Sequence, residues 1–424
     1  MKSKKLKKWT TLVTCATALT VMTACSQSNS QATGTTTSSK TSAVTATTSK
    51  KTTNNKSNYF TSKDSDTSYD ESSSSKIKLS GSSADVSGDG VAVSGSTVTI
   101  SKAGTYVISG KSDGVQIKVD AGDSDDVHIV LDGATMTNTN APINATSAGH
   151  VYLTPKDGTT STLSDSSSNS DEDADAVIFS KGDLTINGSG TLNIDAKKNN
   201  GIKANDSLHI TGGTYKITSV GDAFNVNDEF NITGTTMTIE AEEDGVKVDN
   251  DDDTSVGTMY LSDNTMTINA GDDGIHASGD LIIDSGTYKV KKSTEGIEGK
   301  SVTINGGNID VYATDDGVNA ANANASQSEI FFKMTGGTLN VEVGEGDTDP
   351  IDSNGDIIVS GGTINLTGQS GFDFDGSATY TGGDITINGE KQTKIENSMP
   401  GGGGPQGDGG PQGGGQPGGF SGGH

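Results

Sequence analysis

The chain of 424 residues lacks arginine altogether, and it contains only 2 cysteines and 1 tryptophan. Cys15 and Trp9 fall within the first 24 residues, where a lysine-rich start precedes an apolar stretch that ends at Ala24. This pattern is typical of an export signal, which takes no part in the fold. Removal of the signal leaves Cys25 as the one cysteine, so we expect no disulfide within the chain.

Positive charge is also scarce. The chain has 29 lysines, its only strongly basic residues, against 55 aspartate and glutamate residues, and its formal net charge is −26. Such a surface repels nucleic acid and anionic lipid and attracts divalent cations. We therefore expect no nucleic-acid partner, and contact with a membrane only through an anchor.

The residues around Cys25 predict such an anchor. Val21-Met22-Thr23-Ala24-Cys25 resembles the lipobox of bacterial lipoproteins, in which the cysteine is lipidated and becomes the new N-terminus. We interpret residues 1–24 as a lipoprotein signal peptide and Cys25 as the lipidation site, which places the protein at the bacterial cell surface. An ordinary cleaved signal peptide or an uncleaved anchor is the alternative, and either also puts the rest of the chain outside the cytoplasm.

Two segments have low complexity. Residues 25–80 are mostly Ser, Thr, Lys and Asn, which cannot bury enough apolar area to fold. They are predicted to be a disordered tether, and the Gly-, Pro- and Gln-rich residues 399–424 a disordered tail. Residues 81–398 remain for the folded domain, enough for one long solenoid.

One phrase recurs from residue 200 onward: a usually acidic residue, a small residue, and an aliphatic or aromatic residue. A Gly-Gly-Thr phrase follows about ten residues later. A period near 22 residues with longer outliers indicates one structural unit per repeat, with insertions. The recurring phrases begin at Asn200, Asp222, Asp244, Asp273, Glu295, Asp316, Asp349 and Ser370.

Within a repeat the apolar residues alternate in three short runs separated by turn residues, a pattern that predicts three strands. No stretch after Cys25 has the 3.6-residue apolar period of a helix. We therefore predict an all-β fold, a right-handed parallel β-helix with about 22 residues per coil. The Thr and Asn column of the Gly-Gly-Thr phrases, which runs from Thr214 to Asp384, would suit its narrow interior. A propeller would need about 40 residues per blade.

Equivalent residues stack in such a fold, so the acids that open the phrases would form a column at one corner. Carboxylates about 5 Å apart repel each other unless water or a cation lies between them. Oxygen ligands at this spacing suit Ca²⁺. The alternative is that the acids are solvated turn residues. The predicted metal ligands are Asp244, Asp272, Asp273, Glu295, Asp315 and Asp316.

A second row lies two residues after each small residue. If the intervening Ile or Val points inward, this row points outward and forms a polar strip. The strip could lie along an extended polysaccharide and hydrogen-bond with successive hydroxyl groups; a solvated sheet face is the alternative. His276 considered alone is expected to be a surface residue. The predicted polysaccharide-binding residues are Lys247, His276, Glu298 and Asn319.

Catalysis is not expected, and no catalytic residue is assigned. A polysaccharide lyase needs a cation and a base, usually Lys or Arg. The chain has no arginine, and Lys203 or Lys247 beside the acid column would have a raised pKa, the wrong direction for a base. A lyase with Ca²⁺ and a lysine base, or a structural adhesin or envelope protein that binds no glycan, remains the alternative function.

Three stretches resemble a bacterial family of secreted carbohydrate-binding β-helix proteins related in fold to pectate lyases. They are DGIHASGDLIIDSGTYKV, EGIEGKSVTINGGNIDVYATDDGVNA and DSNGDIIVSGGTINL, and the likeness covers about residues 110–390. The resemblance implies binding of cellulose and acidic pectic sugars, with Ca²⁺ in the helix. The positions that match the family's repeated acidic motif are Asp244, Asp273, Glu295 and Asp316.

The resemblance weakens at Asp349-Pro350-Ile351 and Ser370-Gly371-Phe372, which break the acidic motif. Without tryptophan in the mature chain, sugar rings would stack on tyrosines. Tyr215 and Tyr288 occupy one repeat position, where later repeats have Leu339 and Ile364, so we expect these two tyrosines in the core. We predict a lipid-anchored monomer that binds polysaccharide without cleaving it.

Overall fold

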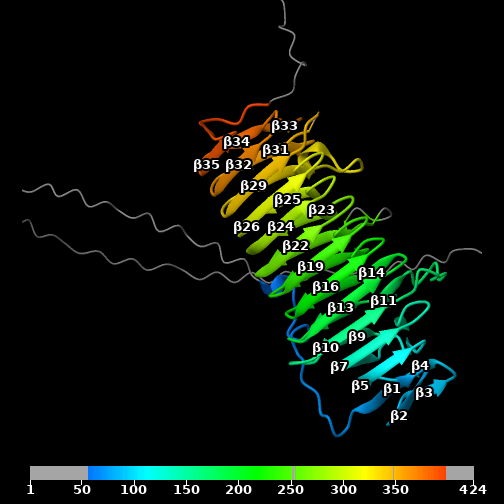
Figure 1. The fold of residues 1–424 in the computed structure, drawn as a ribbon. Helices are drawn as coiled ribbons and strands as arrows, with labels where there is room; N and C mark the ends of the chain where they lie inside the picture. The colour runs from blue at the N-terminus through cyan, green and yellow to red at the C-terminus, as the bar shows by residue number, and fades with distance from the viewer. Residues whose placement is uncertain (1–55, 251–252, 254, 347, 398–424) are drawn as a thin grey trace, which may run out of the picture. The chain divides into compact units, whose positions relative to one another are not determined.

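The computed structural model describes residues 56–250, 253, 255–346 and 348–397. These residues form 36 strands in one hydrogen-bonded sheet whose pairings are mostly parallel, together with the short 3-10 helices η1 (Lys56–Asn58) and η2 (Gln327–Glu329). Within the described ranges no helix is long and apolar enough to span a membrane. Equivalent strands of successive coils lie side by side along the solenoid (Figure 1). The parallel pairing supports the predicted all-β solenoid and excludes a propeller with antiparallel blades.

The strands form three stacks, each with one strand from each coil. In the first stack, the strand that carries the acidic phrase pairs with its equivalent in the next coil. Its members are β4 (Thr97–Ile100), β6 (Gln116–Asp120), β8 (Ile143–Ser147), β11 (Ala176–Ser180), β14 (Asn200–Ala204), β17 (Phe224–Val226), β20 (Val246–Val248), the start of β23 (Ile275–Ile283) and of β25 (Ile297–Ile304), β27 (Val318–Ala320), β30 (Ile351–Ser353) and β33 (Phe372–Phe374).

The second stack includes the C-terminal halves of β23 and β25, which bend from one stack into the next. Its other members are β1 (Ser75–Gly81), β5 (Gly104–Asp113), β7 (Asp126–Thr137), β9 (His150–Pro155), β12 (Leu184–Asn187), β15 (Ser207–Thr211), β18 (Glu229–Thr233), β21 (Thr258–Ser262), β28 (Phe331–Met334), β31 (Asp356–Val359) and β34 (Ala378–Tyr380).

The third stack begins with the paired ends of β5 and β7 and carries the Gly-Gly-Thr phrases. Its members are β10 (Thr160–Ser164), β13 (Thr191–Ala196), β16 (Thr214–Ser219), β19 (Thr236–Ala241), β22 (Asn264–Asn269), β24 (Gly286–Lys292), β26 (Asn308–Ala313), β29 (Thr338–Val343), β32 (Thr363–Thr367) and β35 (Asp384–Ile387). Antiparallel pairs occur near the two ends, where β2 (Ser83–Ser87) pairs with β1, β3 (Val91–Ser94) with β4, and β36 (Glu390–Gln392) with β35.

The core is a continuous column of apolar side chains inside the three stacks. Tyr215 pairs with Met237 and Tyr288 with Met266, and all four are buried. The prediction that Tyr215 and Tyr288 belong to the core is therefore confirmed. Each fully buried large side chain contributes about 1.5–3 kcal/mol.

The prediction for the threonine column was wrong. The column is in register from coil to coil, but its side chains point outward, because each threonine alternates with a large residue that occupies the interior. The exposed members of the column are Thr214, Thr236, Thr265, Thr287, Asn308 and Asp384.

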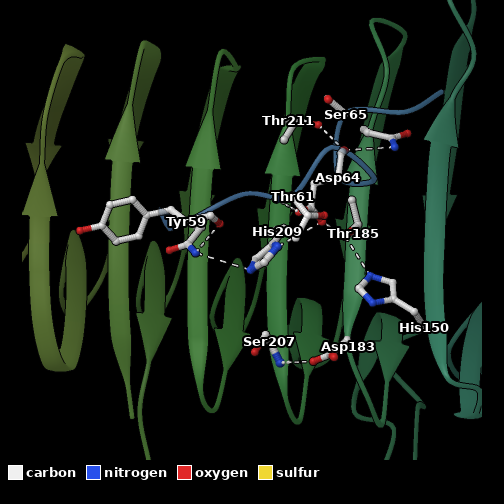
Figure 2. A network of polar contacts seen from close by, with 12 residues as sticks. Tyr59, Thr61, Asp64, Ser65, His150, Asp183, Thr185, Ser207, His209 and Thr211 are labelled. Carbon is white, nitrogen blue, oxygen red and sulfur yellow. Dashed lines mark hydrogen bonds and ion pairs between the residues drawn. The ribbon is translucent and has the colours of Figure 1, made fainter. Parts of the chain in front are cut away.

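The predicted tether ends earlier than residue 80. Residues 75–81 already form β1, and residues 56–70, which we call the strap, lie across the outer face of the second stack. Figure 2 shows Asp64 of the strap beside Thr185 and His209. The Thr185 hydroxyl donates to Asp64 Oδ1 at 2.8 Å, and Asp64 is 2% exposed. The predicted signal, Cys25 and the predicted tail lie outside the described residues.

Candidate polysaccharide and metal site

The acid column is a hydrogen-bonded ladder. The backbone N–H of Asp222 donates to Asn200 Oδ1 at 3.0 Å, and the N–H of Asp244 donates to Asp222 Oδ1 at 3.0 Å. The N–H of Asp273 then donates to Asp244 Oδ1 at 2.8 Å. One oxygen of each of these carboxylates therefore satisfies a buried amide of the next coil, which gives the column a structural role.

Two of the glycines that follow the acids are required by the tight corner. A Cβ on Gly274 would lie 2.5 Å from the carbonyl oxygen of Gly296 in the next coil. On Gly245 it would lie 2.6 Å from the carbonyl oxygen of Gly274. Because real Cβ atoms do not approach an oxygen this closely, glycine at these positions allows adjacent coils to pair.

The polar row predicted from the sequence is in register along the first stack. Its residues pair directly with one another from coil to coil, and all are half-buried. The four predicted polysaccharide-binding residues occupy consecutive coils of this row. The row consists of Lys203, Asn225, Lys247, His276, Glu298, Asn319, Asp352 and Asp373.

The column and the row are linked within each coil. The second oxygens of Asp222, Asp244 and Asp273 face the row residue three positions later, since positions i and i+3 meet across the corner. Asn225 Nδ2 donates to Asp222 Oδ2 at 2.6 Å, and Lys247 Nζ lies 3.0 Å from Asp244 Oδ2. We call the combined column and row the polar strip.

His276 is not the isolated surface residue that the sequence suggested. Its Nδ1 lies 3.0 Å from Asp273 Oδ2 and 2.8 Å from Glu298 Oε2. Burial disfavours the charged imidazole, but the hydrogen bonds to Asp273 and Glu298 outweigh it and raise the pKa of His276 to about 10. His276 is therefore a cation at neutral pH.

The two lysines considered as lyase bases are both held by carboxylates. Burial opposes the charge of Lys247, but the charge of Asp244 and its hydrogen bond raise the pKa of Lys247 above its ordinary value. Lys203 Nζ lies 2.7 Å from Asp175 Oδ1. A proton-abstracting lysine needs a lowered pKa, so the environment of Lys247 works against this role.

The structure brings three of the six predicted metal ligands together. Carboxylate oxygens of Asp244, Asp272 and Asp273 lie within 4.8 Å of one another. Ligand atoms of Asp273, His276 and Glu298 form a second group of this kind. Among the described residues, such groups do not include the remaining predicted ligands, Glu295, Asp315 and Asp316.

The C-terminal part of the strip is rich in half-buried acids. Burial and the charge of Glu298 raise the pKa of Glu295 to about 8. Burial, with the charges of Asp315, Asp349 and Asp373, raises the pKa of Asp316 to about 6, although the Asp349 amide opposes the shift. A nearby cation would stabilise the ionised form of these carboxyl groups.

Asp352 and Asp373 extend this acidic group, and the sequence reasoning placed them in the row without selecting them. Burial and the charges of Asp316, Asp373 and Asp349 raise the pKa of Asp352 to about 7. The buried oxygens Asn319 Oδ1 and Asp373 Oδ1 have no hydrogen-bond partner. Asp352 and Asp373 could have been identified from the sequence by their position in the same row, next to Asp316.

Known proteins resemble this chain in sequence and structure. A model of the family described as carbohydrate-binding domain-containing protein matches residues 94–349 and 274–401. A carbohydrate-binding domain-containing protein of Acetivibrio thermocellus is 40% identical over 124 residues, which are 28% of this chain and 43% of that protein. The chain thus spans less than half the length of that relative. A solved structure, described as the polysaccharide lyase-like protein from C. thermocellum in a gadolinium derivative, has a TM-score of 0.42 and 24% identity, covering 75% of this chain and 95% of that chain.

Proposed function

This chain belongs to the family of carbohydrate-binding domain-containing proteins, and on that basis we propose that it binds extended polysaccharide at the bacterial cell surface without cleaving it. The polar strip is the observation that carries the assignment to a site. Its half-buried side chains repeat once per coil, about 4.8 Å apart, a spacing close to the length of one sugar residue in an extended chain. Successive coils can therefore contact successive sugars.

The N-terminal part of the strip would contact sugar hydroxyl groups. Lys247 and His276 are held in their charged forms by Asp244, Asp273 and Glu298. Because three carboxylates accompany the two cations, sugar hydroxyls can accept from the cations and donate to the carboxylates, whereas a uronate carboxylate would be attracted only where Ca²⁺ is bound. Charge-assisted hydrogen bonds of this kind are about twice as strong as neutral ones.

The C-terminal part of the strip would hold Ca²⁺. The group offers only oxygen ligands, which suit Ca²⁺, and two of its buried oxygens lack a hydrogen-bond partner. The fit supports Glu295, Asp316, Asn319, Asp352 and Asp373 as the residues that would hold the ion. Bound Ca²⁺ supplies positive charge that neutralises the carboxylates of these residues, whose pKa values are raised, and attracts the carboxylate of a uronate.

The group of Asp244, Asp272 and Asp273 fits Ca²⁺ less closely. Asp244 Oδ1 accepts the Asp273 amide and its Oδ2 faces Lys247, while Asp273 faces His276. The carboxylates of Asp244 and Asp273 therefore already have positively charged partners. An ion at this position would have to displace Lys247 and His276 from these carboxylates.

The proposal also includes a lipid anchor and right-handed coils. The lipobox pattern at residues 21–25 supports lipidation of Cys25, with residues 26–55 as the tether between lipid and strap. A right-handed β-helix with about 22 residues per coil is consistent with the ladder bonds, two of which link residues 22 positions apart. We expect the anchored protein to be a monomer.

Calorimetry on the chain produced with its own signal and purified in mild detergent tests the proposal. Ca²⁺ should bind to the wild type and to an Asp384→Asn control, whose carboxylate is exposed on the third stack, and should bind much more weakly to an Asp316→Asn/Asp352→Asn variant. Oligogalacturonate should bind in Ca²⁺ and dissociate in chelator. Equal Ca²⁺ affinity in all three proteins contradicts the metal site, and a product that absorbs in the ultraviolet would indicate a lyase.

A further inference from the structure

The third stack carries a groove that is separate from the polar strip. The groove has a volume of about 480 Å³ and spans four coils, between β24 and β32. Its lining includes Lys289, Lys291, Tyr312, Asn340 and Asn365. None of these residues belongs to the first stack, so a ligand in the groove would contact a different set of strands from a ligand on the polar strip.

Tyr312 places an aromatic ring on the outside of this stack. Tyr312 is 38% exposed, whereas the large apolar side chains that precede it in the third stack, including Tyr288, point into the core. Tyr312 lies four positions after Asn308, which is itself exposed, so strand alternation directs both outward. A half-exposed ring beside a groove offers a flat apolar surface to one face of a sugar ring.

Next to Tyr312 runs a ladder of oriented amides. Asn340 Nδ2 donates to Asp310 Oδ1 at 2.7 Å, and Asn365 Nδ2 donates to Asn340 Oδ1 at 2.8 Å. The Thr386 hydroxyl donates to Asn365 Oδ1 at 2.8 Å. The ladder fixes each amide, and each still has a donor or acceptor site for a ligand. These groups recur at coil spacing, about 4.8 Å.

The charges in the groove are balanced, in contrast to the net charge of −26 for the whole chain. Lys289 and Lys291 oppose Asp310 and Glu342. An acidic sugar therefore gains no net attraction here. The hydroxyls of a neutral sugar can accept from the lysines and donate to the carboxylates, and these charge-assisted hydrogen bonds favour a ligand rich in hydroxyl groups.

We propose that this groove binds a stretch of neutral glycan chain, with Tyr312 stacked on one sugar ring and Asn340, Asn365 and the two lysines bonded to its hydroxyls. The inference rests on the proposed carbohydrate-binding function, and it divides the ligands between two surfaces. Neutral chains occupy the third stack without metal, and uronates occupy the polar strip.

Titration calorimetry with cellohexaose and hexagalacturonate tests this division on the full chain in detergent. Tyr312→Ala should lower the affinity for cellohexaose about tenfold and leave the affinity for hexagalacturonate unchanged. Tyr312→Phe should retain cellohexaose binding, because it keeps the ring. Lys292→Ala, an exposed change in the preceding coil outside the lining, is the matched control, and chelator should not affect the neutral ligand.

The outcomes separate this inference from the proposed function. If hexagalacturonate binds and cellohexaose does not, or if Tyr312→Ala binds cellohexaose as the wild type does, the groove assignment is wrong and the proposed function stands. If Asp316→Asn/Asp352→Asn, rather than Tyr312→Ala, abolishes cellohexaose binding, the neutral ligand belongs to the polar strip. If neither glycan binds to the folded wild type, both proposals fall. An unchanged melting temperature of Tyr312→Ala excludes unfolding as the cause of lost binding.

Discussion

The ring of Tyr59 stacks on the ring of Tyr260, with centroids 3.7 Å apart and planes 5° from parallel. The two residues are far apart in the sequence, and the contact attaches the strap to β21 of the second stack. Asn231 Nδ2 supports it by donating to the carbonyl oxygen of Tyr59 at 2.9 Å. The strap is therefore part of the folded domain.

Loss of this contact should loosen the strap. Tyr59→Ala removes a stacked ring pair that contributes about 0.5–1.5 kcal/mol beyond its buried area. We expect hydrogen exchange in residues 56–66 to become several-fold faster, with no change in the first stack. Lys63→Ala is the control, because the ion pair of Lys63 with Asp126 is exposed and contributes little. Unchanged exchange in Tyr59→Ala would show that the stack does not hold the strap.

The strap should also weaken in alkaline solution. Burial opposes the charge of His209, but Asp64 and Glu229 raise the pKa of His209 to about 9. A raised histidine pKa stabilises the fold fully below the ordinary value near 6.5, and the contribution disappears as the pH rises to about 9. The melting temperature of the wild type should therefore approach that of His209→Gln between pH 6.5 and 9.

NMR titration of the histidine Cε1–H signals provides the direct measurement. The His209 signal should titrate near pH 9. Burial lowers the pKa of His150, so its signal should titrate below 6.5, and His150→Gln is the control variant. A constant difference in melting temperature between wild type and His209→Gln across this range would contradict the role of the charge.

The acid ladder should tolerate an amide but not an alanine. Asp222→Ala removes the acceptor of the buried Asp244 N–H, and an unsatisfied buried donor costs about 1–3 kcal/mol. Asp222→Asn retains the Oδ1 acceptor, and it should unfold close to the wild type because the Asn225 amide can rotate to accept from the new NH2 group instead of donating to Oδ2. Urea unfolding followed by circular dichroism compares the two with Asp272→Ala, whose side chain is exposed. Equal midpoints for all three variants would show that the ladder bonds do not stabilise the fold.

Calcium binding should depend on pH in the range where the carboxyl groups with raised pKa values titrate. Glu295 and Asp352 have pKa values of about 8 and 7, so protons compete with the ion below these values. A raised carboxyl pKa means that the folded state holds the proton more tightly, so metal-free protein should lose stability as the pH rises from about 5 to 8. Ca²⁺ should restore the melting temperature at pH 8 and have little effect at pH 5. Calorimetry should detect proton release on binding, and its absence at pH 7 would contradict the assignment.

The sequence was sufficient to predict the stacking of the solenoid. The recurring phrases gave the equivalent positions, and alternation gave the direction of each side chain, so the register of the row from Lys203 to Asp373 follows from local pattern. The same alternation applied to β26 would also have predicted that Tyr312 points outward. The error on the threonine column came from assigning small polar residues to the interior, when Tyr215 and Tyr288 fill it.

The position of the candidate site could be predicted from the sequence, but the contacts between its side chains could not. The spacing placed Asp273, His276 and Glu298 near one corner. It did not show that His276 joins two carboxylates of adjacent coils, or that Asp222 and Asp244 each use one oxygen to satisfy an amide of the next coil. Those features depend on the angle at which the chain turns between stacks.

The strand periodicity, the acidic character and the rows of equivalent residues can all be read from the sequence, because each follows from alternation and repetition over short distances. The docking of the strap on the second stack, the burial of particular acids and the position of the groove depend on contacts that form only in the folded protein. Asp64 reaches Thr185 and His209 through contacts between residues far apart in the chain. A polar segment without apolar periodicity carries no local signal for such contacts, since its stability comes from partners that the fold brings to it.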